Sequence, residues 1–194
     1  MAHYYEYRTT KDVDAWWTNE ATERDKNKIV EILETTLTKF GEVTTRRFGD
    51  VVSVDLHING KITFNFQIAT RSALLKAPEK CAWSPIELDS LDDLIASKMS
   101  ALIERGAPRD FLDIYTLCNK KVVTIPQCWQ LWKEREIKRG RGAPDFRFGC
   151  EGLLLHLSRI ERMRPLKEIS DPQKRKQAEA LRKWFKYEFC KEKT

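Results

Sequence analysis

Several features that mark familiar classes of protein are missing from this chain of 194 residues. Its five cysteines include no C-x-x-C pair and its three histidines stand far apart, so neither a disulfide framework nor a zinc site is indicated. No apolar run approaches the roughly 18 residues of a membrane span, and the start, MAHYYEYRTT, lacks the apolar core of a signal peptide. We therefore expect a cytoplasmic protein in a reducing compartment, with no membrane partner.

Acidic residues are scarce in the C-terminal part of the chain. Residues 120–194 carry 20 lysines and arginines against 10 acidic residues, a net charge of +10, whereas residues 1–119 have a net charge of −4. A basic segment favours a nucleic-acid partner, because cationic side chains neutralise phosphates. Solvated helix faces give the same count, so charge alone leaves both interpretations open.

Hydrophobic residues make up 41% of the chain, enough for a folded core, and the N-terminal part shows both strand and helix patterns. The stretch YYEYRTTKDVDAWW alternates and predicts a strand, whereas DKNKIVEILETTLTKFG has apolar residues at helical spacing and stops at Gly41. The stretch DVVSVDLHINGKITFNFQIA has period two on both sides of Asn59-Gly60. This pattern predicts a β-hairpin.

Two registers of this hairpin are open, and they place the side chains differently. A two-residue turn over 59–60 would pair Asp55 with Phe64, a polar residue with an apolar one. A three-residue turn over 59–61 pairs Asp55 with Asn65 and sorts apolar and polar residues onto separate faces. We therefore predict the second register, with Asp55 and Asn65 as neighbours on a polar face.

The remainder of the chain is predicted to be mainly helical. After a loop over 71–88, a capping box at Ser90 opens the helix SLDDLIASKMSALIERG. The stretches APRDFLDIYTLC, IPQCWQLWKEREIKRG, CEGLLLHLSRIERMRP and PQKRKQAEALRKWFKYEFC predict four more helices.

Asp12 and Asp14 lie two residues apart in the first predicted strand. Residues with this spacing point to the same face, so both carboxylates project together while Val13 turns toward the core. Paired carboxylates suit Mg²⁺, which commonly bridges one or two carboxylates and the phosphates of a nucleotide. A polar strand end or a turn would show the same two acids, so the pair alone leaves both interpretations open.

Lys98 lies in the middle of the apolar arc of its helix, one turn from both Leu94 and Leu102. Its stem could pack while the ammonium reaches water past the helix edge. Alternatively, the ammonium points into a cleft that holds phosphate. The next helix begins with Asp110 and Asp113 on one side, where acidic side chains also complement the helix dipole.

Two motifs carry a resemblance to a known family. RTTKDVD together with LIASKMSALIERGAPRDFLDIYTL resembles the AbiEii/AbiGii-type nucleotidyltransferase toxins, members of the DNA-polymerase-β-like superfamily, and RIERMRPL and WFKYEF are similar to the tail of some members. The motif residues are Arg8, Thr10, Asp12, Asp14, Lys98, Arg105, Arg109, Asp110 and Asp113.

This resemblance implies a nucleotidyltransferase-like mixed sheet flanked by helices. It implies transfer of a nucleotidyl group from a nucleoside triphosphate to an RNA such as tRNA, or to a protein hydroxyl, with Mg²⁺ or Mn²⁺ as cofactor and an antitoxin protein as a partner. It also implies that Asp12 and Asp14 hold the metal and that Lys98 contacts the nucleotide phosphates. Further nucleotide-binding positions are Arg8, Thr10, Arg109, Asp110 and Asp113.

Two departures from the family's pattern bear on the expected activity. The family places a Gly-Gly or Gly-Ser pair about a dozen residues before the first motif to cradle phosphate, and only seven residues precede Arg8. We therefore expect weak triphosphate binding unless another segment or chain supplies that turn. The superfamily also uses a third carboxylate on a neighbouring strand. The predicted register offers Asp55 as this catalytic group, whereas alignment of KITFNFQIA offers Asn65, which cannot act as a base.

We therefore predict an α/β (α+β) protein with an N-terminally truncated nucleotidyltransferase-like core at residues 1–118 and a basic helical region at 119–194. The expected function is a Mg²⁺-dependent nucleotidyltransferase of the toxin–antitoxin type. The alternative is a catalytically inactive relative that binds nucleotide, RNA or a partner protein. A metal-dependent nuclease fits less well, because no lysine follows Asp55 and Gln67 at the E-x-K spacing.

Overall fold

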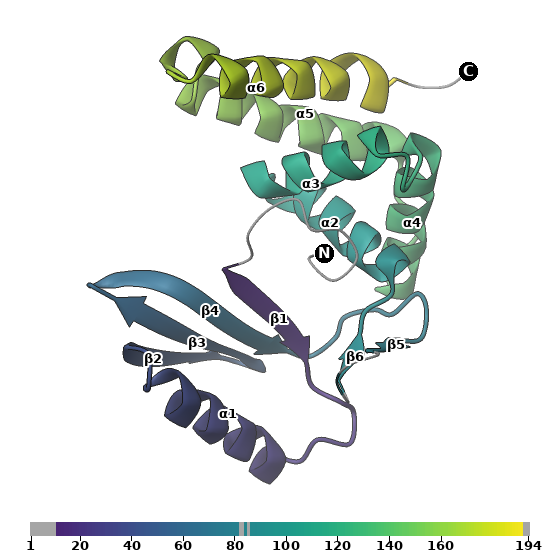
Figure 1. The fold of residues 1–194 in the computed structure, drawn as a ribbon. Coiled ribbons are helices and arrows are strands. Elements are labelled where there is room, and N and C mark those ends of the chain that lie inside the picture. Colours follow the sequence, from purple (N-terminus) through teal and green to yellow (C-terminus); the bar gives the residue numbers. More distant parts are fainter. Residues whose placement is uncertain (1–10, 82–83, 85, 192–194) are drawn as a thin grey trace. The chain divides into compact units, whose positions relative to one another are not determined.

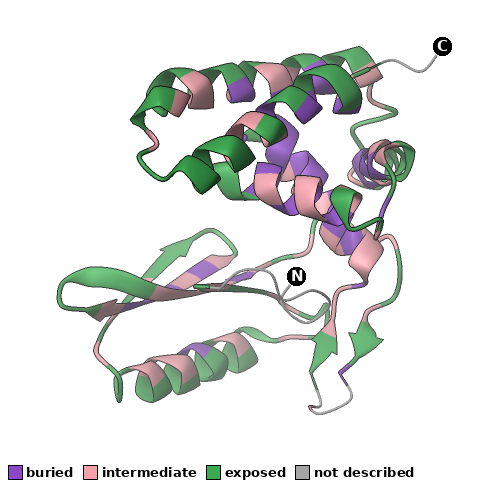
Figure 2. Ribbon diagram, turned by 45° about the horizontal axis from the view of Figure 1, so that its top comes forward, coloured by how far each residue is buried: buried purple, intermediate pink, exposed green. Residues whose placement is uncertain are grey.

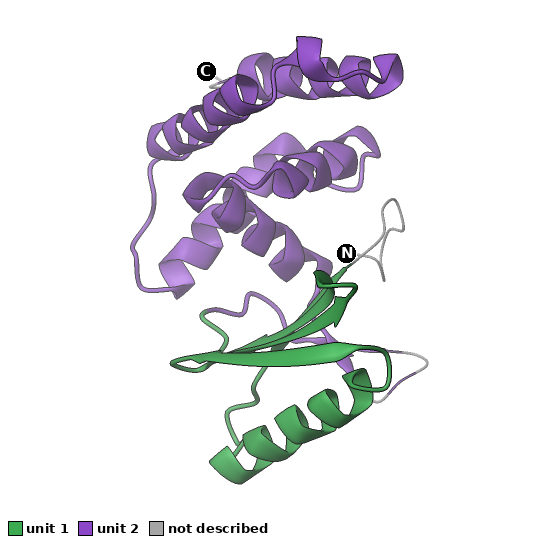
Figure 3. Ribbon diagram, turned by 90° about the vertical axis from the view of Figure 1, so that its left-hand side faces the viewer, with its two compact units in different colours: residues 1–72 green, residues 73–194 purple. Residues whose placement is uncertain are grey.

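The computed structural model describes residues 11–81, 84 and 86–191 (Figure 1). It confirms the predicted mixed α/β class. The chain forms two compact units, residues 1–72 and 73–194 (Figure 3). The predicted boundary after residue 118 therefore falls inside the second unit, because the helices on both sides of it pack against one another.

The first unit is a four-stranded mixed sheet with one helix along one face (Figure 1). The strand order is β1-β4-β3-β2, with β1 parallel to β4 and the other neighbours antiparallel. A capping box formed by Thr22 and Asp25 opens the helix. The elements are β1 (Asp12–Trp16), α1 (Glu23–Leu37), β2 (Glu42–Phe48), β3 (Val51–Ile58) and β4 (Lys61–Ala69).

The core of the first unit is small. Val30 of α1 packs against Val52 and Val54 of β3, and partly buried residues from α1, β2 and β4 surround them. The prediction that Val13 turns into the core is wrong, since 37% of this residue is exposed. The reason is that α1 packs over β2 and β3, whereas β1 lies at the far edge of the sheet.

The predicted hairpin register is confirmed along most of its length. Asp55 pairs with Asn65, and Val52 pairs with Ile68. The apolar residues of β3 therefore face α1, and its polar residues lie on the opposite face. The strand β2, which was not predicted, pairs with the other side of β3. Its sequence signal is the turn pair Gly49-Asp50 between two alternating stretches.

The turn of the hairpin differs from the prediction. His57 pairs with Ile62, and the register shifts between Leu56 and His57, so the turn has two residues rather than three. Asn59 and Gly60 have φ values of 52° and 70°, as a tight hairpin turn of the mirror-image type requires. The β-bulge thus combines the favoured Asn-Gly turn with a ladder that keeps both faces sorted.

The second unit is helical, and all the helices predicted for this part of the chain are confirmed. Two short paired strands lie within the stretch that was predicted as a loop. The elements are β5 (Glu79–Lys80), β6 (Glu87–Leu88), α2 (Leu91–Glu104), α3 (Pro108–Asn119), α4 (Ile125–Lys138), α5 (Phe146–Met163), the 3₁₀ turn η1 (Leu166–Glu168), α6 (Pro172–Trp184) and the π-helical turn η2 (Phe185–Phe189).

Buried residues concentrate in these helices (Figure 2). Phe111 of α3 meets Phe185 edge-on at 4.9 Å between ring centroids, and Phe185 lies 5.0 Å from Phe189. These aromatic contacts join α3 to the C-terminal helices. Among the described helices, none is both long enough and apolar enough to span a membrane.

Candidate functional site

The carboxylate pair lies on β1, as the spacing predicted. Asp12 pairs with Asn65 of β4, and Asp14 pairs with Gln67. Partners in a ladder share a face, so both acids lie on the face that carries the amides of β4. This is the face opposite α1, because the intervening residue Phe66 packs against the core.

Two polar rows continue from these acids across the whole sheet. They run through Asn65, Asp55 and Thr44, and through Gln67, Ser53 and Arg46. The expectation that Asp55 lies opposite Asn65, on the face of Asp12 and Asp14, is confirmed. We call this surface the polar face; it comprises Asp12, Asp14, Thr44, Arg46, Ser53, Asp55, Asn65 and Gln67.

Asp55 is the buried centre of the polar face. Only 3% of its side chain is exposed, and its Oδ2 accepts a hydrogen bond from Arg46 Nη2 at 2.6 Å. Its Oδ1 accepts one from Asn65 Nδ2, also at 2.6 Å. The same Nδ2 donates to Ser53 Oγ at 2.8 Å. To act as a general base, Asp55 would have to exchange one of these bonds for the acceptor hydroxyl.

Arg46 belongs to the site but was missed in the sequence, because β2 was missed. Its side chain is 55% exposed, although one guanidinium nitrogen is bound to Asp55. The signal was present in EVTTRRF, where Thr44 and Arg46 lie two residues apart and therefore share a face.

The ligands that the polar face offers to a hard divalent cation are few: the carboxylates of Asp12 and Asp14 and the amide of Asn65. Within the described residues, no group of three or more His, Cys, Asp and Glu side chains is arranged to hold a metal ion. Two carboxylates on one strand with an amide as ladder partner suit an ion such as Mg²⁺. That ion keeps several waters and binds one or two carboxylates plus substrate phosphates. The donor set therefore fits Mg²⁺ or Mn²⁺.

Lys98 of α2 forms a second charged cluster, in the second unit. Its Nζ lies 2.8 Å from Asp110 Oδ1 and 3.1 Å from Asp113 Oδ2, both on α3. The side chains of both acids are at least 97% buried, and Lys98 is 24% exposed. The lysine therefore pairs with two carboxylates instead of only reaching past the helix edge. Arg105 Nε lies 3.6 Å from Asp110 Oδ2.

These pairs determine the charge state of Lys98. Burial lowers the pKa of the ammonium, but the carboxylates of Asp110 and Asp113 outweigh burial, and the net pKa is raised. Lys98 therefore stays charged at neutral pH, fixed in direction by two acids.

A tight turn brings α2 and α3 together. Gly106 has a φ of 60°, and a Cβ at this position would lie 2.2 Å from the Cβ of His156 on α5. Only glycine allows both this backbone conformation and this close approach. The turn places the first turn of α3, with Asp110, beside Lys98.

The remaining predicted nucleotide-binding residues are Arg8, Thr10 and Arg109. Arg8 and Thr10 lie outside the described residues, and Arg109 is exposed on α3. Asp12 and Asp14 belong to the first unit and Lys98 to the second, so their convergence on one triphosphate stays a prediction.

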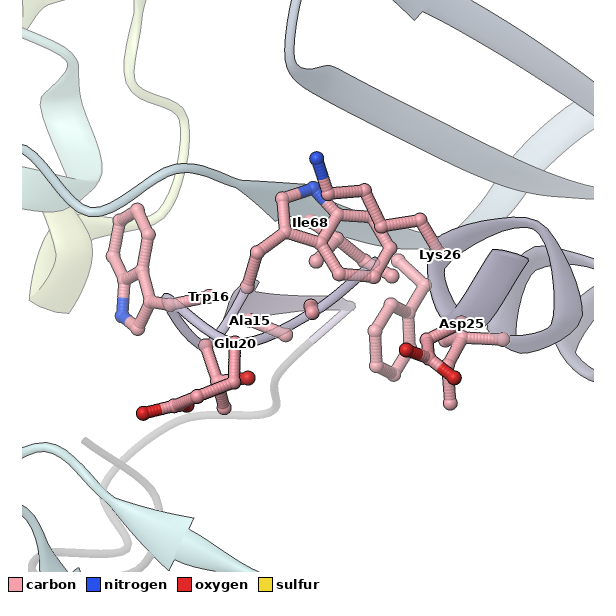
Figure 4. A pocket seen from close by; sticks show the side chains of 11 residues that line it. Ala15, Trp16, Glu20, Asp25, Lys26 and Ile68 are labelled. Atoms are coloured by element: carbon pink, nitrogen blue, oxygen red, sulfur yellow. The ribbon is translucent and has the colours of Figure 1, made fainter. Parts of the chain in front are cut away.

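An apolar groove lies on the other face of the sheet, away from the polar face. It has a volume of about 390 Å³, and its apolar lining comes from β1, β4 and α1. Figure 4 shows Trp16 at one end and Lys26 with Asp25 at the other. Trp17 also lines it and is anchored by a hydrogen bond from its Nε1 to the carbonyl oxygen of Asp50.

Comparison with known proteins gives one match. Residues 1–188 match the model of a protein family described as Nucleotidyl transferase AbiEii toxin, Type IV TA system. No curated protein and no solved structure matches the chain. The matched range includes the first unit, most of the second unit and every candidate site residue.

Proposed function

The chain belongs to the AbiEii nucleotidyl transferase toxin family, and on this basis we propose that it transfers a nucleotidyl group from a nucleoside triphosphate to an RNA, using Mg²⁺ or Mn²⁺. The observation that carries this proposal is the polar face, where Asp12 and Asp14 lie together on one strand beside Asn65. A sheet face with paired carboxylates is suited to an ion that also binds triphosphate oxygens.

Each candidate residue has a role that follows from its chemistry. Asp12 and Asp14 would hold the ion, which when bound supplies positive charge at the reacting phosphates. Lys98 would contact the phosphates, since Asp110 and Asp113 hold its ammonium charged and oriented. Further phosphate or nucleotide contacts are proposed for the exposed Arg109 and for two residues before β1, which are Arg8 and Thr10.

We propose RNA as the acceptor because of the basic C-terminal region. Lys174 of α6, for example, has 77% of its side chain exposed. Replacement of Lys174 and Lys176 by glutamine should weaken RNA binding, and more at about 50 mM than at 200 mM salt, because fewer counterions are released. The same replacements at Lys28 and Lys39 of the first unit are the matched control. An RNA affinity that does not depend on salt would contradict this assignment.

The family indicates the partners of the chain, and its cysteines indicate the compartment. Membership in a toxin–antitoxin family implies an antitoxin partner and a nucleotide substrate. We propose the cytoplasm as the compartment, because all five cysteines are free thiols, as expected in a reducing environment.

One observation favours a second candidate function. Asn65 stands where alignment with the superfamily expects a carboxylate, and an amide cannot accept the proton of an attacking hydroxyl. A relative without that base would bind nucleotide or RNA without transferring a nucleotidyl group.

The experiment that separates these functions uses the four α-³²P-labelled nucleoside triphosphates, Mg²⁺, total RNA and total protein. We expect label on RNA with the wild-type chain and none with Asp12→Asn/Asp14→Asn. Label on protein would move the acceptor to a protein hydroxyl. Triphosphate binding without any transfer would establish the binding function and overturn the proposed one.

A further inference from the structure

The amide of Asn65 has a defined orientation. Both bonds of its Nδ2 go to β3, at 2.8 Å to Ser53 Oγ and 2.6 Å to Asp55 Oδ1. These two bonds use both hydrogens of the amide nitrogen. Because the amide nitrogen points to β3, the carbonyl oxygen, which branches from the amide carbon behind it, is directed away from β3. The strand on that side is β1, where Asp12 is the ladder partner of Asn65.

Asp55 is what fixes this orientation. A carboxylate accepts hydrogen bonds and donates none, so an Asn65 amide flipped by 180° would place two oxygens against each other. Arg46 holds the other oxygen of Asp55 at 2.6 Å, which keeps the carboxylate from turning. The side chain of Asp55 is itself 97% buried. Asp55 therefore determines which way the Asn65 amide faces.

We propose that the Asn65 carbonyl oxygen is a third, uncharged ligand of the cation held by Asp12 and Asp14, and that Asp55 and Arg46 are positioning residues for it. The proposal rests on the proposed function, because it assumes the cation site of that function. Amide oxygens are normal ligands for hard cations. On this view, the asparagine retains a ligand at the position of the missing carboxylate, without its charge or basicity.

The test is to measure Mn²⁺ binding by the full chain without nucleotide. Binding is detected as the loss of the electron paramagnetic resonance signal of free Mn²⁺. We expect Asn65→Leu to weaken binding roughly 10-fold, and Asp55→Asn by 10-fold to 100-fold, the range for residues that orient metal ligands. In Asp55→Asn one acceptor becomes a donor. If Arg46 keeps its bond to the remaining oxygen, the new amide nitrogen faces Asn65. Asn65 would then turn its own oxygen toward β3 to accept a hydrogen bond from it.

Two further variants keep the result interpretable. Thr45→Val is the matched control, because Thr45 neighbours Arg46 on β2 but donates to Glu34 of α1 on the opposite face; we expect unchanged Mn²⁺ affinity. Arg46→Met leaves the buried Asp55 carboxylate without its cation, so it should lower stability and, because Asp55 can then turn, weaken Mn²⁺ binding several-fold. Asn65→Leu keeps the Arg46–Asp55 pair and tests the inference even if the Asp55 and Arg46 variants do not fold.

The outcomes distinguish this inference from the proposed function. If Asp12→Asn/Asp14→Asn abolishes Mn²⁺ binding while Asn65→Leu and Arg46→Met bind it as tightly as the wild type, the positioning role is wrong and the cation site stands. If the double variant also binds Mn²⁺ like the wild type, the cation site itself is wrong, and both proposals fail.

Discussion

The two units bury their side chains in different ways. Among the described residues, the first unit buries three valines, one leucine and one isoleucine from α1, β3 and β4, whereas the second unit buries several phenylalanines and leucines among its helices. Figure 2 shows the buried positions concentrated in the helices of the second unit. The middle of the opposite face of the sheet is left to polar residues. The sheet unit therefore has a thin apolar core and presents functional groups, whereas the helical unit has the larger core.

Charged residues show the same contrast. In the first unit the buried Asp55 pairs with Arg46, whose side chain is 55% exposed at the surface of the sheet. In the second unit Lys98, Asp110 and Asp113 pair between two helices with little exposure. Replacement of one member of a buried cluster strongly lowers the stability of the fold, because the remaining charges stay in a poorly solvated site.

The largest expected effect on stability is in the helical core. Phe185→Ala removes a ring that is fully buried against Phe111 and Phe189, and should lower the free energy of unfolding by about 4 kcal/mol. Val54→Ala in the sheet core removes less volume and should cost about 2 kcal/mol. Urea unfolding followed by circular dichroism measures both. Equal losses would contradict the comparison of the two cores.

Replacement of Lys98 tests the buried cluster. Lys98→Met leaves two carboxylates without their shared cation and should cost about 3 kcal/mol at pH 7. Because the folded pKa of Lys98 is raised, its contribution is fully present below its unfolded pKa of about 10.4 and is lost as pH rises through the folded value. The difference in unfolding free energy from wild type should stay constant from pH 7 to 9. A loss under 1 kcal/mol would mean that water already solvates the cluster.

The smallest expected effect is at the partly exposed Glu104. Burial raises the pKa of this carboxyl, but hydrogen bonds and charge from Arg141 and Arg139 outweigh burial and lower it overall. Its contribution is therefore present above its unfolded pKa of about 4.3 and lost as pH falls through the lower folded value. Because solvent screens the pair, Glu104→Gln should cost no more than about 0.5 kcal/mol at pH 7, and this difference should narrow as the pH falls below the unfolded pKa. A difference that widens on acidification would contradict this sign.

Local signals were sufficient to predict most of the elements. The Ser90 cap and the Asn59-Gly60 turn identified a helix and a hairpin, and alternation gave the pairing of Asp55 with Asn65. The bulge was not predicted. The Asn-Gly pair favours a two-residue turn, whereas separation of polar and apolar faces favours the register of a three-residue turn. The bulge allows both, and neither pattern alone indicates it.

Contacts between distant segments could not be predicted in the same way. Lys98 was recognised as unusual on an apolar arc, but its pairing with Asp110 and Asp113 depends on how the Gly106 turn packs against His156. Arg46 was missed because β2 was not predicted. Its contact with Asp55 depends on the register between β2 and β3, which no local pattern shows. For Asp12 and Asp14 the spacing was enough, since strand geometry alone places both on one face.

The most direct test of the account is the single-turnover rate of nucleotidyl transfer to RNA in saturating Mg²⁺, compared between the wild type and Asp12→Asn, Asp14→Asn and Thr45→Val. We predict that each aspartate variant loses at least about 10³-fold in rate, because charge stabilisation at the phosphates is lost. Their urea midpoints should stay close to that of the wild type, and Thr45→Val should keep its rate. Transfer at the wild-type rate by either aspartate variant would contradict the claim that the polar face of the sheet carries the chemistry.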